Sequence, residues 1–369
     1  MIPLVKPLFG NEEVNAVKRV LDSGWVAGQG PAGAEFEQKF KDKFGYPNAV
    51  AVNNCTAALH LSLLSLGIGP GDEVLVSDYT YPATAHAVKY CGAKPIFVDI
   101  HEDTYNMNVA DAEEKITDHT KAIMPVHAFG QSADLDSVHD LARKRGLKVI
   151  EDAACAVGTK FKGQFVGKNS EFACFSFHAR KGISTGEGGM LVTRSASLAE
   201  KARSLSCFGI QSAFKRQSNE FVLPSFRELG YNYKLSDILS AIGVEQLIKL
   251  DGIISSKRKL AKAYSEELEG ANGITPPFED PRGFHVYQSF VCLVGEGVNR
   301  DKLIQKLREN GICAQIGTYA CHLQPVYGSK QACPVSKDVF ERALALPLYA
   351  EMTEEEVHSV VKKIGACIK

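Results

Sequence analysis

Short apolar runs alternate with amphipathic segments along the first 200 residues of the chain. The apolar runs are typical of buried strands, and segments between them, such as residues 134–146, have helical spacing. Strands that alternate with helical crossovers predict a wound, mostly parallel α/β sheet. The predicted strands are AVAVNN (49–54), EVLVSD (73–78), PIFVDI (95–100), KAIMPVHAFG (121–130), KVIEDAACAVG (148–158), FACFSFH (172–178) and GGMLVT (188–193).

The last third of the chain has a different pattern. Residues 236–270 keep helical spacing without a proline and predict one long connecting helix. A turn-rich segment follows at 271–283, and beyond it shorter strand and helix patterns alternate. We therefore predict a large domain over residues 1–250 and a smaller α+β domain over residues 251–369.

Composition and charge exclude several classes of protein. The formal net charge of −1 gives no global field that would attract nucleic acid or an anionic membrane. No apolar run approaches the length of a membrane span, and the first residues lack the apolar core of a signal peptide, so we expect a cytoplasmic protein. The ten cysteines form no CxxC pair and no zinc-like spacing, which predicts that most are reduced core residues and that no metal is bound.

Lys181 is the strongest candidate for chemistry. It lies in FSFHARKGISTGEGG (175–189), between a predicted buried strand and a cluster of glycines that allows the backbone to turn tightly beside a ligand. A lysine amine at such a point suits nucleophilic carbonyl chemistry. On these residues alone, a surface lysine in a glycine-rich turn is an equal alternative.

The wider pattern resembles the DegT/DnrJ-type nucleotide-sugar aminotransferases, which are fold-type I enzymes that use pyridoxal 5'-phosphate. The similarity runs nearly end to end and is specific in its combination and order. The matching segments are SGWVAGQGPAGAEFEQKF (23–40), VNNCTAALHLSL, GPGDEVLVSDYTYPAT, PVHAFGQ, VIEDAACAVG, FSFHARKGISTGEGG, LGYNYKLSDILSAIG, CHLQPVY and LPLYAEMTEEEV.

The resemblance implies a role for each matching residue. Lys181 is expected to hold the cofactor as a Schiff base, and Asp152 to pair with the nitrogen of its pyridine ring. Adjacent strand residues point to opposite faces, so only one of Glu151 and Asp152 can meet the ring, and the family pattern selects Asp152. The other expected cofactor contacts are Thr56, Ala57 and Ser176 at the phosphate, Tyr81 stacked on the ring, and Asn232 supplied to the phosphate by a partner subunit in a homodimer.

Substrate contacts are less sharply indicated. His178 and His322 match positions near the substrate pocket, and Lys215 and Arg216 lie in a loop that is suited to the diphosphate of a nucleotide. Each has a structural alternative, namely a core histidine or a solvated charge. Cys55 and Cys155 depart from the commonest family pattern, in which glycine precedes the threonine and glutamine or histidine lies beside the cofactor hydroxyl.

The resemblance implies a ping-pong aminotransferase. We expect it to move an amino group from L-glutamate, through pyridoxamine phosphate, to a nucleotide-linked 4-keto-6-deoxyhexose, in the manner of perosamine-synthase-like enzymes of polysaccharide and O-antigen biosynthesis. Amination at sugar C3 or of a cyclitol ketone is the alternative within the family. A non-catalytic, regulatory member of the fold is a further one.

Overall fold

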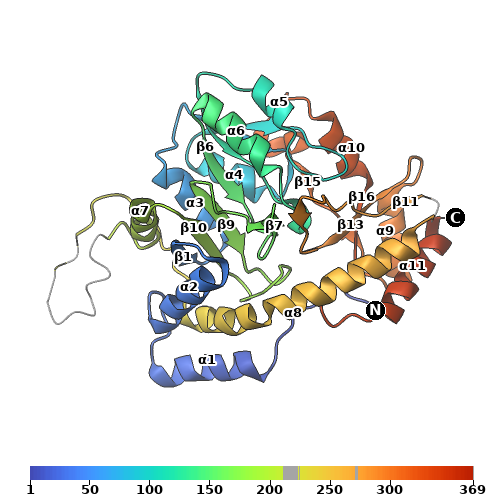
Figure 1. Ribbon diagram of the computed structural model, residues 1–369, viewed down its shortest axis with the longest axis horizontal. Helices are drawn as coiled ribbons and strands as arrows, with labels where there is room; N and C mark the ends of the chain where they lie inside the picture. Colours follow the sequence, from blue (N-terminus) through green and yellow to red (C-terminus); the bar gives the residue numbers. More distant parts are fainter. Residues whose placement is uncertain (211–222, 224, 271–272, 369) are drawn as a thin grey trace.

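The structure is a computed structural model that describes residues 1–210, 223, 225–270 and 273–368. Its centre is a seven-stranded sheet of order β1-β10-β9-β6-β5-β2-β4, covered by helices on both faces (Figure 1). All its neighbouring strands run parallel except β10, which is antiparallel to both β1 and β9. This confirms the predicted mostly parallel α/β fold. The strands are β1 (Asn48–Val52), β2 (Glu73–Ser77), β4 (Lys94–Val98), β5 (Thr120–Met124), β6 (Lys148–Asp152), β9 (Phe172–Ser176) and β10 (Gly189–Thr193).

The strands read as continuous apolar runs because both faces of the sheet are buried. Successive side chains alternate between faces: Val74 and Val76 enter one core cluster, and Leu75 enters another. Helices α3, α4 and α7 contribute to the first cluster and α5 and α6 to the second, while α2 and α8 cover β9 and β10. Their bounds are α2 (Pro31–Phe44), α3 (Cys55–Ser65), α4 (Ala83–Tyr90), α5 (Val109–Glu114), α6 (Leu135–Arg145), α7 (Ala196–Ser206) and α8 (Asp237–Leu268).

The predicted connecting helix is confirmed as α8, which begins where the Ser236 side chain accepts a hydrogen bond from the Leu239 N–H. It runs from beneath the large sheet to a second, antiparallel sheet of order β11-β13-β16-β14 (Figure 1). The predicted domain boundary at residue 250 falls inside this helix and stays a prediction. The second sheet and its helices comprise β11 (Ile274–Thr275), β13 (Phe290–Val294), α9 (Arg300–Glu309), β14 (Gln315–Ile316), α10 (Pro334–Arg342), β16 (Ala343–Leu346) and α11 (Glu354–Ile368).

Short strands join the two parts of the molecule. β15 (Tyr319–Ala320) pairs with β3 (Tyr79–Thr80), and β12 (Gly283–Phe284) pairs with β7 (Lys160–Phe161), which forms a hairpin with β8 (Gln164–Phe165). The N-terminal helix α1 (Asn11–Ser23) packs along α8. The pairing of β15 with β3 matters for the site, because it brings residues 319–322 beside the carboxyl ends of the parallel strands.

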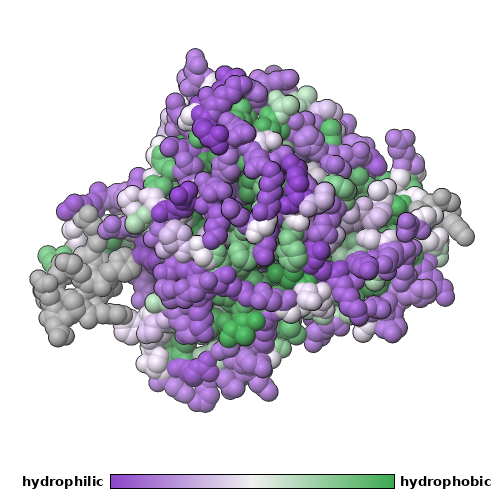
Figure 2. Space-filling model, viewed as in Figure 1, coloured by the Kyte–Doolittle hydropathy of each residue, from purple (hydrophilic) through white to green (hydrophobic). Residues whose placement is uncertain are grey.

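The surface is mostly hydrophilic on the face drawn in Figure 2, with hydrophobic residues grouped near its middle and below it. In the described part of the chain, no helix combines the length and the apolar character that a membrane span requires. All ten cysteines are free, and eight of them are buried, which confirms the prediction that most of them are core residues.

Candidate active site

Lys181 lies in the loop that connects β9 to the antiparallel strand β10. Two backbone hydrogen bonds shape this loop: the Lys181 N–H donates to the His178 carbonyl at 2.8 Å, and the Ala179 N–H donates to the Gly186 carbonyl at 3.1 Å. Gly186 has φ +85°, a backbone conformation that favours glycine. The loop directs the Lys181 side chain toward the end of β6, where its Nζ lies 3.1 Å from the Cys155 Sγ.

The two adjacent carboxylates of β6 serve opposite faces of the sheet, as predicted from strand geometry. The buried Glu151 contacts the His127 Nε2 at 2.8 Å and accepts hydrogen bonds from the Ser170 hydroxyl and the Gly167 N–H. Asp152, which is 4% exposed, accepts a hydrogen bond from the Thr84 hydroxyl at 2.7 Å and another from the Ala154 N–H at 3.1 Å. Glu151 is therefore held within the core, and Asp152 is the carboxylate on the side of Lys181.

The N-terminus of α3 forms the third part of the site. Its Asn54 cap accepts a hydrogen bond from the Ala57 N–H at 2.8 Å, whereas the Thr56 N–H donates to no other described residue. Gly189 of β10 allows this terminus to approach closely, since a Cβ on Gly189 would lie 2.6 Å from the carbonyl carbon of Asn54 and 2.7 Å from the Cys55 nitrogen. Ser176 pairs with Gly189 across the two strands. The predicted phosphate residues Thr56, Ala57 and Ser176 are thus brought to one place.

The charges of the lysine loop, the end of β6 and the N-terminus of α3 affect one another's pKa values. Burial alone would lower the pKa of Lys181, but the adjacent Cys155 and the Asp152 carboxylate outweigh burial and raise that pKa above its ordinary value. Burial also raises the pKa of the Cys55 thiol well above its usual range. Cys55 therefore stays a neutral thiol, and its Sγ contacts the Cys174 carbonyl at 3.5 Å.

These residues fit pyridoxal phosphate on the chemistry of their donors and acceptors. A helix N-terminus with a free N–H and a nearby hydroxyl suits a phosphate. We call this group, the N-terminus of α3 with Ser176, the phosphate cradle, and the absence of a side chain at Gly189 lets its two parts lie close together. A buried carboxylate suits a protonated ring nitrogen, and a lysine amine suits an aldehyde. The chain therefore has residues for the phosphate, the ring and the aldehyde of the cofactor.

Tyr81 lies beside this cradle at the start of α4 and is 59% exposed. Its ring meets the Tyr319 ring edge to face, with centroids 6.1 Å apart. Together with Thr56, His86 and Tyr90, these two tyrosines line a surface cavity of about 320 Å³. An exposed aromatic face next to the phosphate cradle is the placement that a stacking residue requires.

The structure places His178 at the start of the lysine loop, where its Nε2 lies 3.8 Å from a carboxylate oxygen of Glu187. Burial lowers the pKa of His178 below its ordinary value. Asn232 is exposed, and its side-chain oxygen accepts a hydrogen bond from the Lys234 amine. Lys215 and Arg216 lie outside the described residues.

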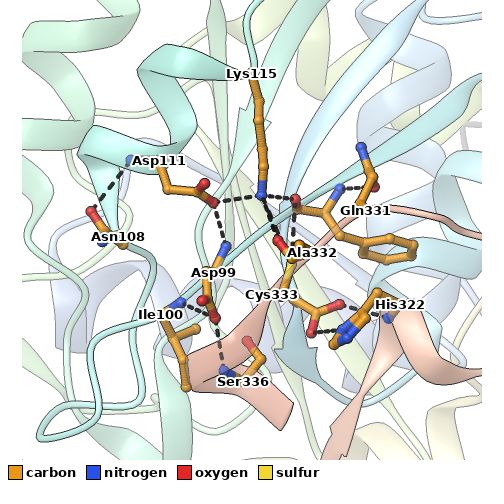
Figure 3. Close-up of polar contacts among 12 residues, drawn as sticks. Asp99, Ile100, Asn108, Asp111, Lys115, His322, Gln331, Ala332, Cys333 and Ser336 are labelled. Carbon is orange, nitrogen blue, oxygen red and sulfur yellow. Dashed lines mark hydrogen bonds and ion pairs between the residues drawn. The ribbon is translucent and has the colours of Figure 1, made fainter.

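His322 does not line the cavity beside Tyr81 and instead bonds to the buried Asp78. Asp78 accepts hydrogen bonds from the His322 N–H at 2.6 Å and from its ring Nδ1 at 2.6 Å (Figure 3). The ligand atoms of Asp78, His322 and Cys333 lie within 4.8 Å of one another, which is also compatible with a metal. However, the Lys115 amine lies 3.9 Å from the Cys333 Sγ, and the contacts with His322 satisfy Asp78 without an ion. We interpret the cluster as a polar attachment of residues 321–336 to the large sheet.

Two other residues, Lys115 and Asp99, strengthen this attachment. The Lys115 amine donates to Asp111 at 2.7 Å and to the Ala332 carbonyl at 3.4 Å, and Asp99 accepts a hydrogen bond from the Ser336 N–H near the start of α10 (Figure 3). Asp99 also accepts a hydrogen bond from the Val335 N–H. The bonds to Ala332, Val335 and Ser336 join residues more than 200 positions apart in the sequence. They fix the segment that follows Tyr319 and β15.

Sequence reasoning missed three residues that support the site. Thr84 bonds to Asp152, Gln288 donates from its side-chain amide to the Arg180 carbonyl at 2.6 Å, and the buried Lys257 donates to the Gln288 carbonyl at 2.8 Å. Gln288 and Lys257 thereby hold the peptide that precedes Lys181. Only the Pro-Ala-Thr run at the start of α4 gave a local signal, as a helix start, and no local pattern links Lys257 to the loop.

Comparisons with known proteins agree with this geometry. Residues 7–365 match the DegT/DnrJ/EryC1/StrS aminotransferase family. The chain is 38% identical to the GDP-perosamine synthase of Escherichia coli O157:H7 over 365 residues, which cover 99% of this chain and 98% of that protein. The solved structure of the aminotransferase TlmJ from Streptoalloteichus hindustanus has a TM-score of 0.93 at 31% identity, covering 100% of this chain and 98% of TlmJ. The putative sugar aminotransferase Spr1654 from Streptococcus pneumoniae, in its PMP-form, has a TM-score of 0.94 at 27% identity, covering 100% and 99% of the two chains.

Proposed function

Because the chain belongs to the DegT/DnrJ/EryC1/StrS aminotransferase family and is a pyridoxal-phosphate-dependent sugar aminotransferase, we propose a specific reaction for it. The enzyme moves the amino group of L-glutamate to the 4-keto group of a nucleotide-linked 6-deoxyhexose in two half-reactions of a ping-pong cycle. The observation that carries this proposal is the convergence of Lys181, Asp152 and the N-terminus of α3. The similarity of the chain to a GDP-perosamine synthase supports a keto sugar as the acceptor.

We assign the cofactor contacts as follows. The N-terminus of α3 at Thr56 and Ala57 binds the phosphate together with the Ser176 hydroxyl, and Tyr81 covers one face of the ring. Asp152 binds the ring nitrogen, and its bonds from Thr84 and Ala154 fix the carboxylate in one orientation. When bound, pyridoxal phosphate withdraws electrons from the substrate carbon into its ring.

The proton transfers belong to Lys181. With the cofactor bound, the Lys181 amine would remove the proton from the donor carbon and would return it at the carbon of the cofactor aldehyde. The loop anchored by Gln288 keeps the Lys181 backbone fixed while the flexible side chain moves its Nζ between the two positions. Asp152 stabilises the charge that develops in the ring during this transfer.

The active unit is a homodimer in this proposal, with Asn232 of one subunit completing the phosphate site of the other. Exposed hydrophobic residues support an interface near Asn232. Phe208, which follows the bridge partner of Asn232, Cys207, is 46% exposed, and Phe226 and Leu229, a few positions before Asn232 in the sequence, are 65% and 85% exposed. Lys215 and Arg216 follow Phe208 closely in the sequence, and we assign them with His178 to the nucleotide sugar. His322 is left out of this assignment because its ring is held by the buried Asp78. We place the enzyme in the cytoplasm, where its ten free thiols persist.

An absorbance experiment on the cofactor-loaded protein tests the first half-reaction. Addition of L-glutamate should convert the bound cofactor to pyridoxamine phosphate and release 2-oxoglutarate, and Lys181→Ala should do neither. Lys162→Ala, which removes a lysine that is 56% exposed in its side chain, is the matched control and should behave as the native protein. A spectrum that ignores glutamate would exclude this donor, and full turnover by Lys181→Ala would exclude the assigned mechanism.

A panel of keto acceptors tests the second half-reaction. The pyridoxamine form should react with a nucleotide-linked 4-keto-6-deoxyhexose and regenerate the pyridoxal form. Reaction only with a 3-keto sugar or with a cyclitol ketone would replace the proposed acceptor while leaving the donor half-reaction unchanged.

A further inference from the structure

Cys155 and Lys181 form a contact between a thiol and an amine in the candidate active site. The Lys181 Nζ lies 3.1 Å from the Cys155 Sγ. Cys155 and Cys313 are the two cysteines that are partly exposed, and the other eight are buried. A small oxidant can therefore reach Cys155 at the place where the catalytic amine is held against it.

A second buried lysine faces the same thiol. Lys257 is 3% exposed, its Nζ donates to the Gln288 carbonyl at 2.8 Å, and its charge interacts with Cys155. The Gln288 side chain in turn bonds to the Arg180 carbonyl, so the loop that carries Lys181 is fixed next to Cys155. Cationic groups and partial exposure are the surroundings in which cysteines are oxidised selectively.

We propose that hydrogen peroxide links Cys155 to Lys181 through a covalent sulfur–nitrogen bond when the cofactor is absent, and that bound cofactor prevents the link. The bond joins Sγ and Nζ directly and removes the lysine amine from use. A thiol reductant reverses it by attack on the sulfur, which releases the amine.

The chemistry balances in two steps. The Cys155 sulfur attacks one peroxide oxygen, the O–O bond breaks, and the products are a sulfenic acid and one water, so that sulfur is oxidised by two electrons and peroxide is reduced. The Lys181 ammonium releases one proton to water. The neutral amine so formed attacks the sulfur, the S–O bond breaks, and hydroxide leaves with a second proton from the amine as a second water. The linked protein is two hydrogen atoms lighter than the reduced protein.

The consequence is reversible inactivation, here called the lock, of protein that has not yet bound its cofactor. The link keeps Cys155 from further oxidation to a sulfinic acid, which thiols do not reverse. It also blocks cofactor attachment until the thiol is restored. Cofactor-loaded enzyme escapes the lock because its lysine is already engaged.

Peptide mapping of the full-length protein tests the proposal. Cofactor-free and cofactor-loaded samples are treated with hydrogen peroxide, quenched, alkylated and digested with trypsin without reduction. The link predicts loss of cleavage after Lys181 and a joined species of VIEDAACAVGTK (149–160) and KGISTGEGGMLVTR (181–194) that is two hydrogen atoms lighter than the two peptides together. Dithiothreitol should restore both peptides, and the cofactor-loaded sample should not form the species.

Matched variants separate this pair from general oxidation. Cys155→Ser, Cys155→Ala and Lys181→Arg should abolish the joined species, whereas Cys313→Ser, at the other partly exposed cysteine, should leave it unchanged. Oxidation of Cys155 to sulfinic acid with normal cleavage after Lys181, a disulfide from Cys155 to another cysteine, or an unmodified Cys155 would each overturn the proposal.

Formation of the link does not rest on the proposed function, whereas protection by the cofactor rests on the proposed role of Lys181. If the link forms but the cofactor gives no protection, the assignment of Lys181 as the cofactor lysine fails and the link stands. If Lys181 binds the cofactor in the absorbance experiment but no link forms, only the link fails.

Discussion

Lys257→Met is expected to change the pH dependence of stability in a defined way. Lys257 is a buried lysine on α8, and the contact that the described residues offer its Nζ is the neutral Gln288 carbonyl. Burial lowers the pKa of Lys257 from its ordinary value of 10.5 to about 8, and the nearby Cys155 only partly offsets this. The folded protein thus carries an ammonium group at neutral pH in a place that disfavours charge.

The size of this cost follows from the two pKa values. A fall from 10.5 to about 8 corresponds to about 3 kcal/mol of unfolding free energy. The unfolded chain binds more protons than the folded chain between these two pH values, so stability rises with pH in that window. Below pH 8 the full cost is present, and above pH 10.5 it is absent. Methionine keeps an unbranched chain of similar length and removes the charge, at the loss of a hydrogen bond worth about 1 kcal/mol.

Urea denaturation at a series of pH values measures the effect. The unfolding free energy of the native protein, minus that of Lys257→Met, should rise by about 3 kcal/mol between pH 8 and pH 10.5. Taking the difference cancels the contributions of groups that titrate in both proteins. Lys262→Met, whose lysine side chain is 77% exposed on the same helix, controls for the loss of a lysine as such. Parallel curves for the native protein and Lys257→Met would refute the argument that Lys257 is desolvated.

Three further predictions concern the site and its support. Thr84→Val removes a hydrogen bond to the Asp152 carboxylate that is worth about 1.5–3 kcal/mol, so a cofactor titration should show roughly tenfold or greater weakening, with Thr84→Ser near native. Hydrogen bonds outweigh burial and hold the pKa of Glu151 below its ordinary value of 4.5, so its contribution is present at neutral pH and lost as pH falls through that lowered pKa. Glu151→Gln should therefore lower the unfolding free energy by about 3–5 kcal/mol at pH 7, which melting temperatures would register as a large decrease. Below pH 4.5 the melting temperature of the variant should approach that of the native protein, and a difference that persists in acid would contradict this. Gly189→Ala must displace the backbone at Asn54, so cofactor affinity should fall while the protein stays folded by circular dichroism; native affinity would show that the cradle tolerates a Cβ.

Much of the large sheet was predictable because its strands are buried on both faces. A strand such as Phe172–Ser176, in which every residue is buried, leaves an uninterrupted apolar run in the sequence. Helix α6 was visible for a similar reason, since Asp134 caps its start and Gly146, with φ +69°, ends it. The positions of Asp152 at the end of β6 and of Lys181 in the loop after β9 followed from the same runs.

The supporting contacts were not predictable in this way. Thr84 and Asp152 are separated by 68 positions, and Lys257 and Gln288 by 31, so neither pair leaves a periodic signal. The bond between Asp78 and His322 spans 244 positions and depends on the pairing of β3 with β15. Strands of two residues such as these are too short for an alternating pattern to identify.

Glu151 and Asp152 have different roles, so one strand both stabilises the core and provides a carboxylate to the candidate site. Glu151 has three hydrogen-bond partners on its own face, which compensate for burial of its charge and anchor β6. Asp152 has two donors, Thr84 and the Ala154 N–H, and its two oxygens offer about four acceptor positions. The carboxylate is thus oriented by neighbours and still able to accept another hydrogen bond. A one-residue shift of β6 would exchange these faces, placing the Asp152 side chain among the partners of Glu151, so the bonds that anchor Glu151 also specify which carboxylate faces Lys181.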